Sequence, residues 1–242
     1  MAKGRSKSGW KSEGAARQPK ERPSESSVTK HVGATVLTRT SPLRGTPAAR
    51  HSASAPRRVR IIGGRWKRTA LPVADVVGLR PTPDRVRETL FSWIEHFVPD
   101  LSAARGVDLF AGTGALGFEL ASRGAARVTL IETNRQLVDQ LTRTKHRLAA
   151  DEIDIVAGDA LAVAARLPSA SFEVIFIDLP FDSGLLAPTL KAAARLITQD
   201  GLIYVETGTA VEESLLSRHR LYLARSGRAG RVHFHLLRPQ SA

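Results

Sequence analysis

The sequence predicts an α/β domain built on a mostly parallel seven-stranded sheet that ends in an antiparallel hairpin. Three observations support this. From residue 106 onward, short apolar runs alternate with amphipathic stretches, which is typical of parallel strands covered by helices on both faces. A glycine-rich run directly follows the first of these apolar runs. The last two β-prone runs, 219–224 and 231–237, are joined by a short glycine-containing loop, which favours a hairpin.

The N-terminal segment differs in composition from the rest of the chain. Residues 1–58 hold 13 of the 36 Lys and Arg residues but 3 of the 23 Asp and Glu residues, without helical or strand periodicity. We predict a disordered basic tail over 1–57, which either gathers the protein onto nucleic acid or only keeps it soluble. The folded domain is expected over 58–242, as an N-terminal hairpin and helix (58–100) followed by a Rossmann-like core (101–242).

Composition excludes several classes of function. The chain has no cysteine, which excludes disulfides, thiolate zinc sites and any reaction that needs a cysteine nucleophile. No apolar run approaches the length of a membrane span, and the N-terminus lacks the apolar core of a secretory signal. We therefore expect a cytoplasmic protein without a membrane partner. His233 and His235 share a strand face, but no third ligand is apparent, so no metal is expected.

A basic segment opens the expected domain. Two β-prone runs flank Gly63-Gly64, a dipeptide that suits a tight hairpin turn. Residues 57–68 include six basic side chains, no acidic one and a tryptophan. Cations can contact phosphates and an aromatic ring can stack on a base, although an ordinary solvated hairpin is the alternative. The RNA-binding candidates here are Arg60, Arg65, Trp66, Lys67 and Arg68.

The next element is an amphipathic helix. Thr82 is the expected N-cap, with Pro83 in the first helical position and Asp84 in the first turn. Apolar residues follow with helical spacing at 86, 90, 93, 94 and 97, and form the face that packs on the core. Arg85 and Arg87 lie at the margins of this face, where they could reach a ligand or water. Arg85 is a further RNA-binding candidate.

Strands and helices then alternate along the remaining chain. Strands are expected at 106–110, 127–131, 153–156, 172–177 and 202–205. Helices are expected up to about residue 123, after Asn134, after residue 160 and over 185–197. Ligands of such sheets bind beyond the carboxyl ends of the strands. Four acids fall at or near these ends, and they are the strongest functional signal in the sequence: Asp108, Glu132, Asp159 and Asp178.

The glycine-rich run indicates a nucleotide-type cofactor. Residues 112–117 match G-x-G-x-x-G, with Glu132 twenty residues beyond Gly112 to accept ribose hydroxyls. Dinucleotide enzymes and S-adenosylmethionine (SAM) enzymes share this pattern. Asp108 favours SAM, because a carboxylate just before the glycines would repel a pyrophosphate but attract the ammonium group of a methionine moiety. A nicotinamide-linked dehydrogenase remains the alternative.

The tetrapeptide after the fourth expected strand indicates the reaction. Asp178, Leu179, Pro180 and Phe181 resemble the [D/N]-P-P-[Y/F] motif of methyltransferases that act on exocyclic amino groups. The Asp178 carboxylate and the Leu179 carbonyl could accept the two amino hydrogens, and Phe181 could stack on the base. A paired base cannot reach such a pocket, so the target must be looped out or flipped. Taken alone, the tetrapeptide also fits a strand end followed by an X-Pro turn.

Longer motifs now make the resemblance specific. The segments 60–64 (RIIGG), 79–91 (LRPTPDRVRETLF), 108–117 (DLFAGTGALG), 122–126 (SRGAA) and 204–206 (YVE) stand in the order seen in the RsmD family, and the resemblance covers about residues 58–240. That family has a Rossmann-like SAM-dependent methyltransferase fold. It methylates the N2 amino group of one guanine in bacterial 16S rRNA, within an assembled or nearly assembled small ribosomal subunit.

The resemblance implies roles for individual residues. Asp108, Gly112 and Gly114 would hold the methionine end of SAM, Glu132 the ribose and Asp159 the adenine, while residues 178–181 would hold the target guanine. With their neighbours, the expected cofactor-binding residues are Asp108, Ala111, Gly112, Thr113, Gly114, Glu132, Asp159 and Ala160. The partner would be 16S rRNA in the small subunit or in its late assembly intermediate, bound by a monomer.

Two departures from the family pattern leave other functions open. Leu179 replaces the first proline of D-P-P-F, and Ser92 stands where the family has asparagine. Leu179, together with the basic tail, makes a ribosome-assembly or RNA-binding factor without catalytic activity one alternative. An amino methyltransferase for DNA adenine or cytosine is another, because it could use the same tetrapeptide.

Overall fold

A computed structural model of the chain describes residues 58–74, 76, 82–180 and 183–241. The expected basic tail, 1–57, lies outside these residues. The strands are β1 Arg58–Arg60, β2 Ala70–Pro72, β3 Arg105–Asp108, β4 Arg127–Glu132, β5 Ile153–Ala157, β6 Phe172–Asp178, β7 Ile197–Thr207, β8 Leu221–Ala229 and β9 Val232–Pro239. The helices are α1 Asp84–Phe97, α2 Ala115–Ser122, α3 Arg135–Leu148, α4 Ala160–Ala164, α5 Leu186–Leu196 and α6 Glu213–Arg218. None of these helices is long and apolar enough to cross a membrane.

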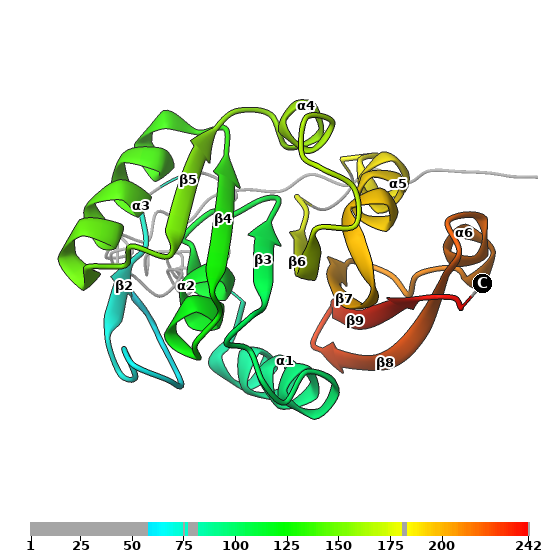
Figure 1. Cartoon of the computed structure of the whole chain (residues 1–242), viewed down its shortest axis with the longest axis horizontal. Helices are drawn as coiled ribbons and strands as arrows, with labels where there is room; N and C mark the ends of the chain where they lie inside the picture. The colour runs from blue at the N-terminus through cyan, green and yellow to red at the C-terminus, as the bar shows by residue number, and fades with distance from the viewer. Residues whose placement is uncertain (1–57, 75, 77–81, 181–182, 242) are drawn as a thin grey trace, which may run out of the picture. The chain divides into compact units, whose positions relative to one another are not determined.

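A seven-stranded sheet forms the centre of the fold, in the order β5-β4-β3-β6-β7-β9-β8 (Figure 1). The strands β3 to β7 pair in parallel, whereas β9 runs antiparallel between β7 and β8. The predicted α/β class, strand number and terminal hairpin are confirmed. The order reverses between β3 and β6, and ligands of open α/β sheets bind at such a switch point.

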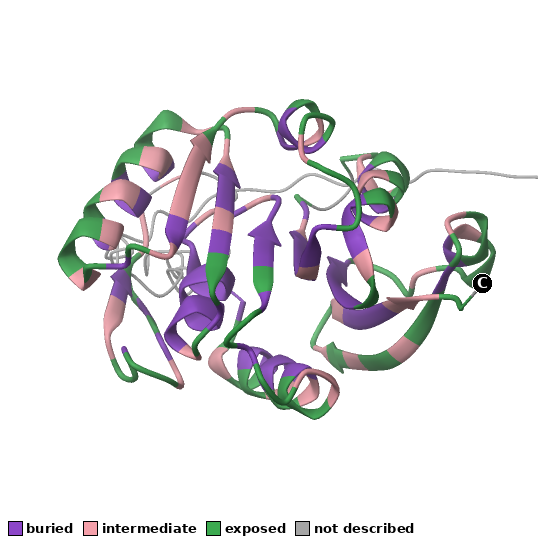
Figure 2. Ribbon diagram, in the orientation of Figure 1, coloured by how far each residue is buried: buried purple, intermediate pink, exposed green. Residues whose placement is uncertain are grey.

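Helices cover both faces of the sheet, because alternate side chains of each strand point to opposite faces. Val174 and Phe176 of β6 pack with the apolar sides of α1 and α2 in one core, while Ile175 and Ile177 pack with α4 and α5 in the other. Figure 2 shows the buried residues of the strands and of the inner helix faces. The burial of β6 on both faces explains why its sequence, 172–177, is a continuous apolar run.

The N-terminal hairpin is present, but its predicted tight turn is wrong. β1 pairs with β2 from Arg58↔Pro72 to Arg60↔Ala70, so residues 61–69 connect the strands. The glycines serve a different purpose, since this connection packs on α2. A Cβ at Gly64 (φ +71°) would lie 1.8 Å from the Ser122 carbonyl oxygen. The backbone N–H of Arg65 donates to the same oxygen at 2.7 Å.

We expect Gly64→Ala to destabilise the protein by about 3 kcal/mol, because the substitution combines a left-handed backbone with a collision against backbone atoms. Gly230→Ala is the matched control. Gly230 has a similar φ of +61°, but its added Cβ would meet no atom within 4 Å, so we expect a cost of about 1 kcal/mol. Urea unfolding of both variants measures the difference. Equal losses would contradict the close packing of the connection on α2.

Helix α1 corrects two further predictions. It begins at Asp84, Pro83 occupies the N-cap position, and no side chain caps the helix. The predicted N-cap role of Thr82 is therefore wrong, because the fold directs its hydroxyl into a cavity instead. Arg87 does not reach solvent or ligand, since it is fully buried. It donates to Asp84 at 2.7 Å and to the Thr82 carbonyl at 3.2 Å.

Candidate functional site

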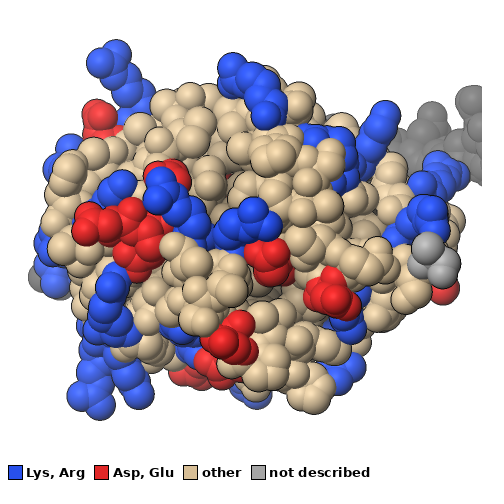
Figure 3. All heavy atoms as spheres, viewed as in Figure 1, with Lys and Arg blue, Asp and Glu red and all other residues tan. Residues whose placement is uncertain are grey.

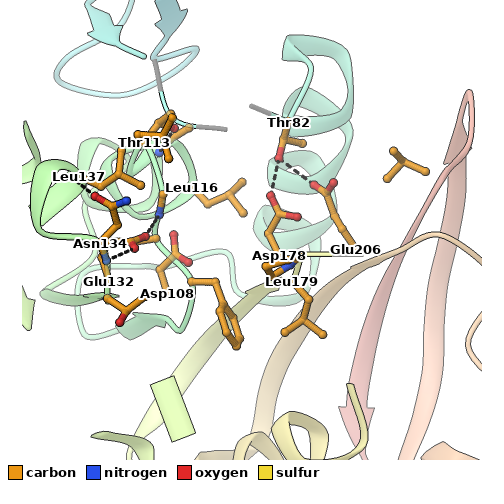
Figure 4. Close-up of a pocket in the computed structure, with 18 of the residues that line it drawn as sticks. Thr82, Asp108, Thr113, Leu116, Glu132, Asn134, Leu137, Asp178, Leu179 and Glu206 are labelled. Atoms are coloured by element: carbon orange, nitrogen blue, oxygen red, sulfur yellow. Dashed lines mark hydrogen bonds between the residues drawn. The ribbon is translucent and has the colours of Figure 1, made fainter. Parts of the chain in front are cut away.

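A cavity of about 490 Å³ opens at the carboxyl ends of β3, β4, β6 and β7, within the size range of ligand pockets. Its polar lining includes Thr82, Asp108, Thr113, Glu132, Asn134, Asp178 and Glu206. Figure 4 shows these side chains in two groups. One contains Asp108, Thr113, Glu132 and Asn134, and the other contains Thr82, Asp178 and Glu206. We call them the glycine-loop side and the tetrapeptide side.

On the glycine-loop side, Glu132 fixes the loop that follows β3. Its carboxylate accepts from the backbone N–H groups of Gly112 and Asn134, both at 2.8 Å. Gly112 and Gly114 adopt φ values of +52° and +78°, which glycine reaches without steric cost. The Asn134 side chain caps α3 by accepting from Gln136 and Leu137, as predicted. Glu132 at the end of β4 therefore links the glycine loop to the residue that caps α3.

Asp108 is the most buried acid on this side. It is 2% exposed, and its Oδ1 has no hydrogen-bond partner among the described residues. The pKa of Asp108 is raised to about 7, mainly by burial and to a smaller extent by the charge of Glu132. Backbone hydrogen bonds from Phe110 and Gly117 lower the pKa and offset part of this rise. A buried carboxylate with a free oxygen at a cavity wall suits a cationic ligand group.

On the tetrapeptide side, the cavity wall follows the end of β6. Asp178 is half-buried, Leu179 is 7% exposed, and both line the cavity together with Pro180. The Thr82 hydroxyl lies 2.8 Å from Glu206 Oε1 and 3.4 Å from Asp178 Oδ2. Burial, followed by the charges of Glu206 and Asp108, raises the pKa of Asp178 well above its usual value. Burial also raises the pKa of Glu206.

The cavity gathers most, but not all, of the residues predicted for the cofactor. Asp108, Ala111, Gly112, Thr113 and Glu132 line it, and Gly114 occupies the N-cap position of α2 directly after them. The other two are not among the lining residues. Asp159 is exposed and caps α4 by accepting from Ala162 at 2.9 Å, while Ala160 is buried in the core. Phe181, predicted to stack on the base, lies outside the described residues.

Of the six predicted RNA-binding residues, the five basic ones lie on the surface and Trp66 is buried. Figure 3 shows Lys and Arg side chains gathered at the lower left, where the β1–β2 connection lies in Figure 1. The exposed candidates are Arg60, Arg65, Lys67, Arg68 and Arg85. Arg60 pairs with Asp84 at 2.8 Å, and Arg65 pairs with Glu152.

Trp66 corrects the prediction of a stacking surface. Its ring is 8% exposed and packs edge-on against Phe118, with the Arg65 guanidinium 4.3 Å from the ring centroid. The prediction that Trp66 is available to stack on a base is wrong, because its large apolar ring is buried in the hydrophobic core.

Two residues of the cavity were missed as site residues. Glu206 follows the apolar strand residues 202–205 just as the other acids follow theirs, so the strand-end rule could have found it. Thr82 could not be found in this way, since its role depends on a contact with Glu206, 124 positions along the chain.

Comparison with known families and proteins gives consistent matches. The family model described as "Conserved hypothetical protein 95" matches residues 59–238. The chain is 42% identical over 159 residues to "Ribosomal RNA small subunit methyltransferase D" of Escherichia coli K12, which covers 65% of this chain and 77% of that protein. The protein of the same name from Haemophilus influenzae is 37% identical over 154 residues, covering 62% and 78% of the two chains.

A solved structure agrees with these sequence matches. The "Putative methyltransferase yhhF" from Escherichia coli superposes with a TM-score of 0.65 and 36% identity, and the match covers 76% of this chain and 99% of that one. The "putative RNA methyltransferase PH1948" from Pyrococcus horikoshii superposes at 18% identity with a TM-score of 0.57, which supports the fold alone.

Proposed function

This chain belongs to the RsmD family, and on that premise we propose that it transfers a methyl group from SAM to the N2 amino group of one guanine in bacterial 16S rRNA. The observation that carries the proposal is one cavity with two chemically different sides. On one side lies the buried carboxylate of Asp108, whose Oδ1 has no partner among the described residues, and on the other lies the tetrapeptide end Asp178-Leu179-Pro180. Such an arrangement suits a cationic cofactor on one side and an amino group on the other.

The residues of the glycine-loop side fit SAM. The free Oδ1 of Asp108 would accept the ammonium group of the methionine moiety, and Glu132 retains lone pairs for ribose hydroxyls beyond its two backbone contacts. We also assign Gly112 and Gly114 to this subsite. Asp159 is exposed and does not line the cavity, so its contact with the adenine remains a prediction from the family resemblance. When bound, SAM supplies an electrophilic methyl group.

The residues of the tetrapeptide side would orient the target amine. The lone pair of an aryl amine is delocalised into the base, so the amino group must be turned toward the methyl donor. The Asp178 carboxylate and the Leu179 carbonyl would accept its two hydrogens. The raised pKa of Asp178 suits a carboxylate that takes up the proton released when the nitrogen is methylated. Phe181 would stack on the flipped base.

We further propose that the substrate is the small subunit or its late assembly intermediate, modified by a monomer in the cytoplasm. The exposed basic residues of the β1–β2 connection and α1 would contact RNA phosphates: Arg60, Arg65, Lys67, Arg68 and Arg85. The basic tail before residue 58 would add non-specific attraction that weakens with salt.

SAM affinity should rise with pH until about 7 and then level off. The pKa of Asp108 is raised to about 7, so below this value the carboxylate must lose a proton before it can pair with an ammonium group. We expect the affinity to fall about tenfold per pH unit below 7. Calorimetric titration with SAM at several pH values measures this dependence. Asp108→Asn should weaken binding by about 10- to 100-fold and remove the dependence; an unchanged dependence in this variant would contradict the assignment.

The test of the proposed function is incubation with labelled SAM and small subunits from a strain that lacks the modification. We expect label on the N2 atom of one guanine of 16S rRNA. Naked 16S rRNA and duplex DNA serve as competing substrates. Label on another base, a preference for duplex DNA, or SAM binding without transfer would contradict the proposal.

A further inference from the structure

Two carboxylates lie side by side on the tetrapeptide side of the cavity. The parallel strands β6 and β7 pair Asp178 with Glu206 in register. The Thr82 hydroxyl contacts one oxygen of each, at 3.4 Å and 2.8 Å (Figure 4). In the proposed function Asp178 and the Leu179 carbonyl orient the target amine, so Glu206 needs an explanation of its own.

The contacts of Glu206 leave one oxygen facing the cavity without a donor. Its Oε1 accepts from both Thr82 and Tyr204, each at 2.8 Å. No described residue donates a hydrogen bond to Oε2, although Glu206 lines the cavity and is 4% exposed. Oε2 is not among the fully buried atoms that lack a partner, so a donor on a ligand in the cavity can reach it. The arrangement is therefore suited to a ligand that brings a donor of its own.

The chemistry of the bases identifies that donor. Guanine presents the N1–H and the N2 amino group next to each other, as adjacent donors on its Watson–Crick edge. Adenine and cytosine present an amino group next to a bare ring nitrogen, which accepts. A carboxylate only accepts when it is ionised. Burial raises the pKa of Glu206, and a hydrogen bond from the N1–H of guanine favours its ionised form against that effect. Two adjacent ionised carboxylates match guanine and oppose the other two amino-bearing bases.

We infer that Glu206 is a specificity-determining residue, whose Oε2 accepts the N1–H of the target guanine while Asp178 accepts from the N2 amino group. This inference rests on the proposed function and adds the choice of base to it. Thr82 and Tyr204 are positioning residues: their hydroxyl groups engage Oε1 and so leave Oε2 to the substrate. The alternative is that Glu206 only anchors Thr82 and the start of α1.

The experiment compares two target bases in the full-length protein. The first substrate is the small subunit reconstituted with natural 16S rRNA. The second carries 2-aminopurine at the mapped target position, which keeps the N2 amino group but has a bare N1. We expect the wild type to lose about 100-fold or more in kcat/KM on 2-aminopurine, because Glu206 then faces an acceptor. In Glu206→Gln, the amide can donate to the bare N1, so this preference should fall at least about tenfold.

Controls separate recognition from folding. Glu213→Gln changes an exposed glutamate of α6 and should retain the full preference. Thermal melting and SAM titration check that each variant is folded. Should Glu206→Gln not fold, Glu206→Asp keeps the charge but withdraws it by one methylene, and should also lose most of the preference.

Each outcome decides the inference. A smaller preference in the Glu206 variants supports it. Equal losses on both substrates would show an anchoring role, and unchanged kinetics on both would show no role; either result overturns the inference while the wild type still methylates guanine. If the wild type methylated no guanine in the small subunit, the proposed function itself would fail, and the inference with it.

Discussion

Asp178→Ala is expected to lower the rate of methyl transfer by about 10²- to 10⁴-fold and to leave SAM binding nearly unchanged. SAM binding should be retained because Asp178 and Leu179 lie on one side of the cavity, whereas Glu132 and the glycine loop, which we assign to SAM, lie on the other. Single-turnover transfer from labelled SAM to small subunits measures the rate, and calorimetry measures SAM binding.

Asp200→Ala is the control for this variant, because the Asp200 side chain is 98% exposed. Within the described part of the chain it forms one ion pair, with Arg238 at 3.7 Å. Its activity should match the wild type. If Asp178→Ala kept full activity, Asp178 would not orient the amine. If the Asp178→Ala variant lost activity but still complemented a deletion strain, the protein would act in that strain as a non-catalytic assembly factor.

Glu119→Ala is expected to destabilise the protein by about 3–5 kcal/mol. The carboxylate is fully buried and accepts from the backbone N–H groups of Ile62 and Gly63 at 2.6 and 2.7 Å. It also accepts from Arg123 at 2.8 Å and lies 3.6 Å from the fully buried Arg87. Its removal leaves Arg87 with less compensating charge and the two backbone donors without an acceptor.

Glu95→Ala is the matched control, because Glu95 also pairs with Arg123 but its side chain is half exposed. We expect a loss of no more than about 1 kcal/mol. Urea unfolding compares the two variants. A loss below about 1 kcal/mol for Glu119→Ala would show that the β1–β2 connection is not held to α2 by this carboxylate.

Local sequence patterns predicted the strands and the core helices well, and long-range contacts account for the errors. A strand such as β6, buried on both faces, has a continuous apolar run because each residue meets a hydrophobic neighbour. Gly64, by contrast, was read as part of a turn, but its conformation fits the close approach of α2. The local pattern places Arg87 at the margin of a helix, but in the structure it is buried and lies 3.6 Å from Glu119, a residue of another helix.

The candidate site shows the same division. The strand-end rule predicted four acids. Asp108, Glu132 and Asp178 line the cavity, whereas Asp159 is exposed and caps α4. The three acids of the cavity follow directly from strand position, because the carboxyl ends of parallel strands meet at one edge of the sheet. The same rule applied to β7 would have added Glu206. No local rule could have found Thr82, whose expected capping role gave way to a contact across the cavity.

The central claim is that this chain methylates one guanine of the small-subunit RNA. The most direct measurement maps N2-methylguanosine along 16S rRNA from cells with and without the gene, and from cells that carry Asp178→Ala. We expect one guanine to be methylated in the presence of the wild-type gene and unmethylated in the other two strains. Identical methylation maps in all three strains would contradict the account.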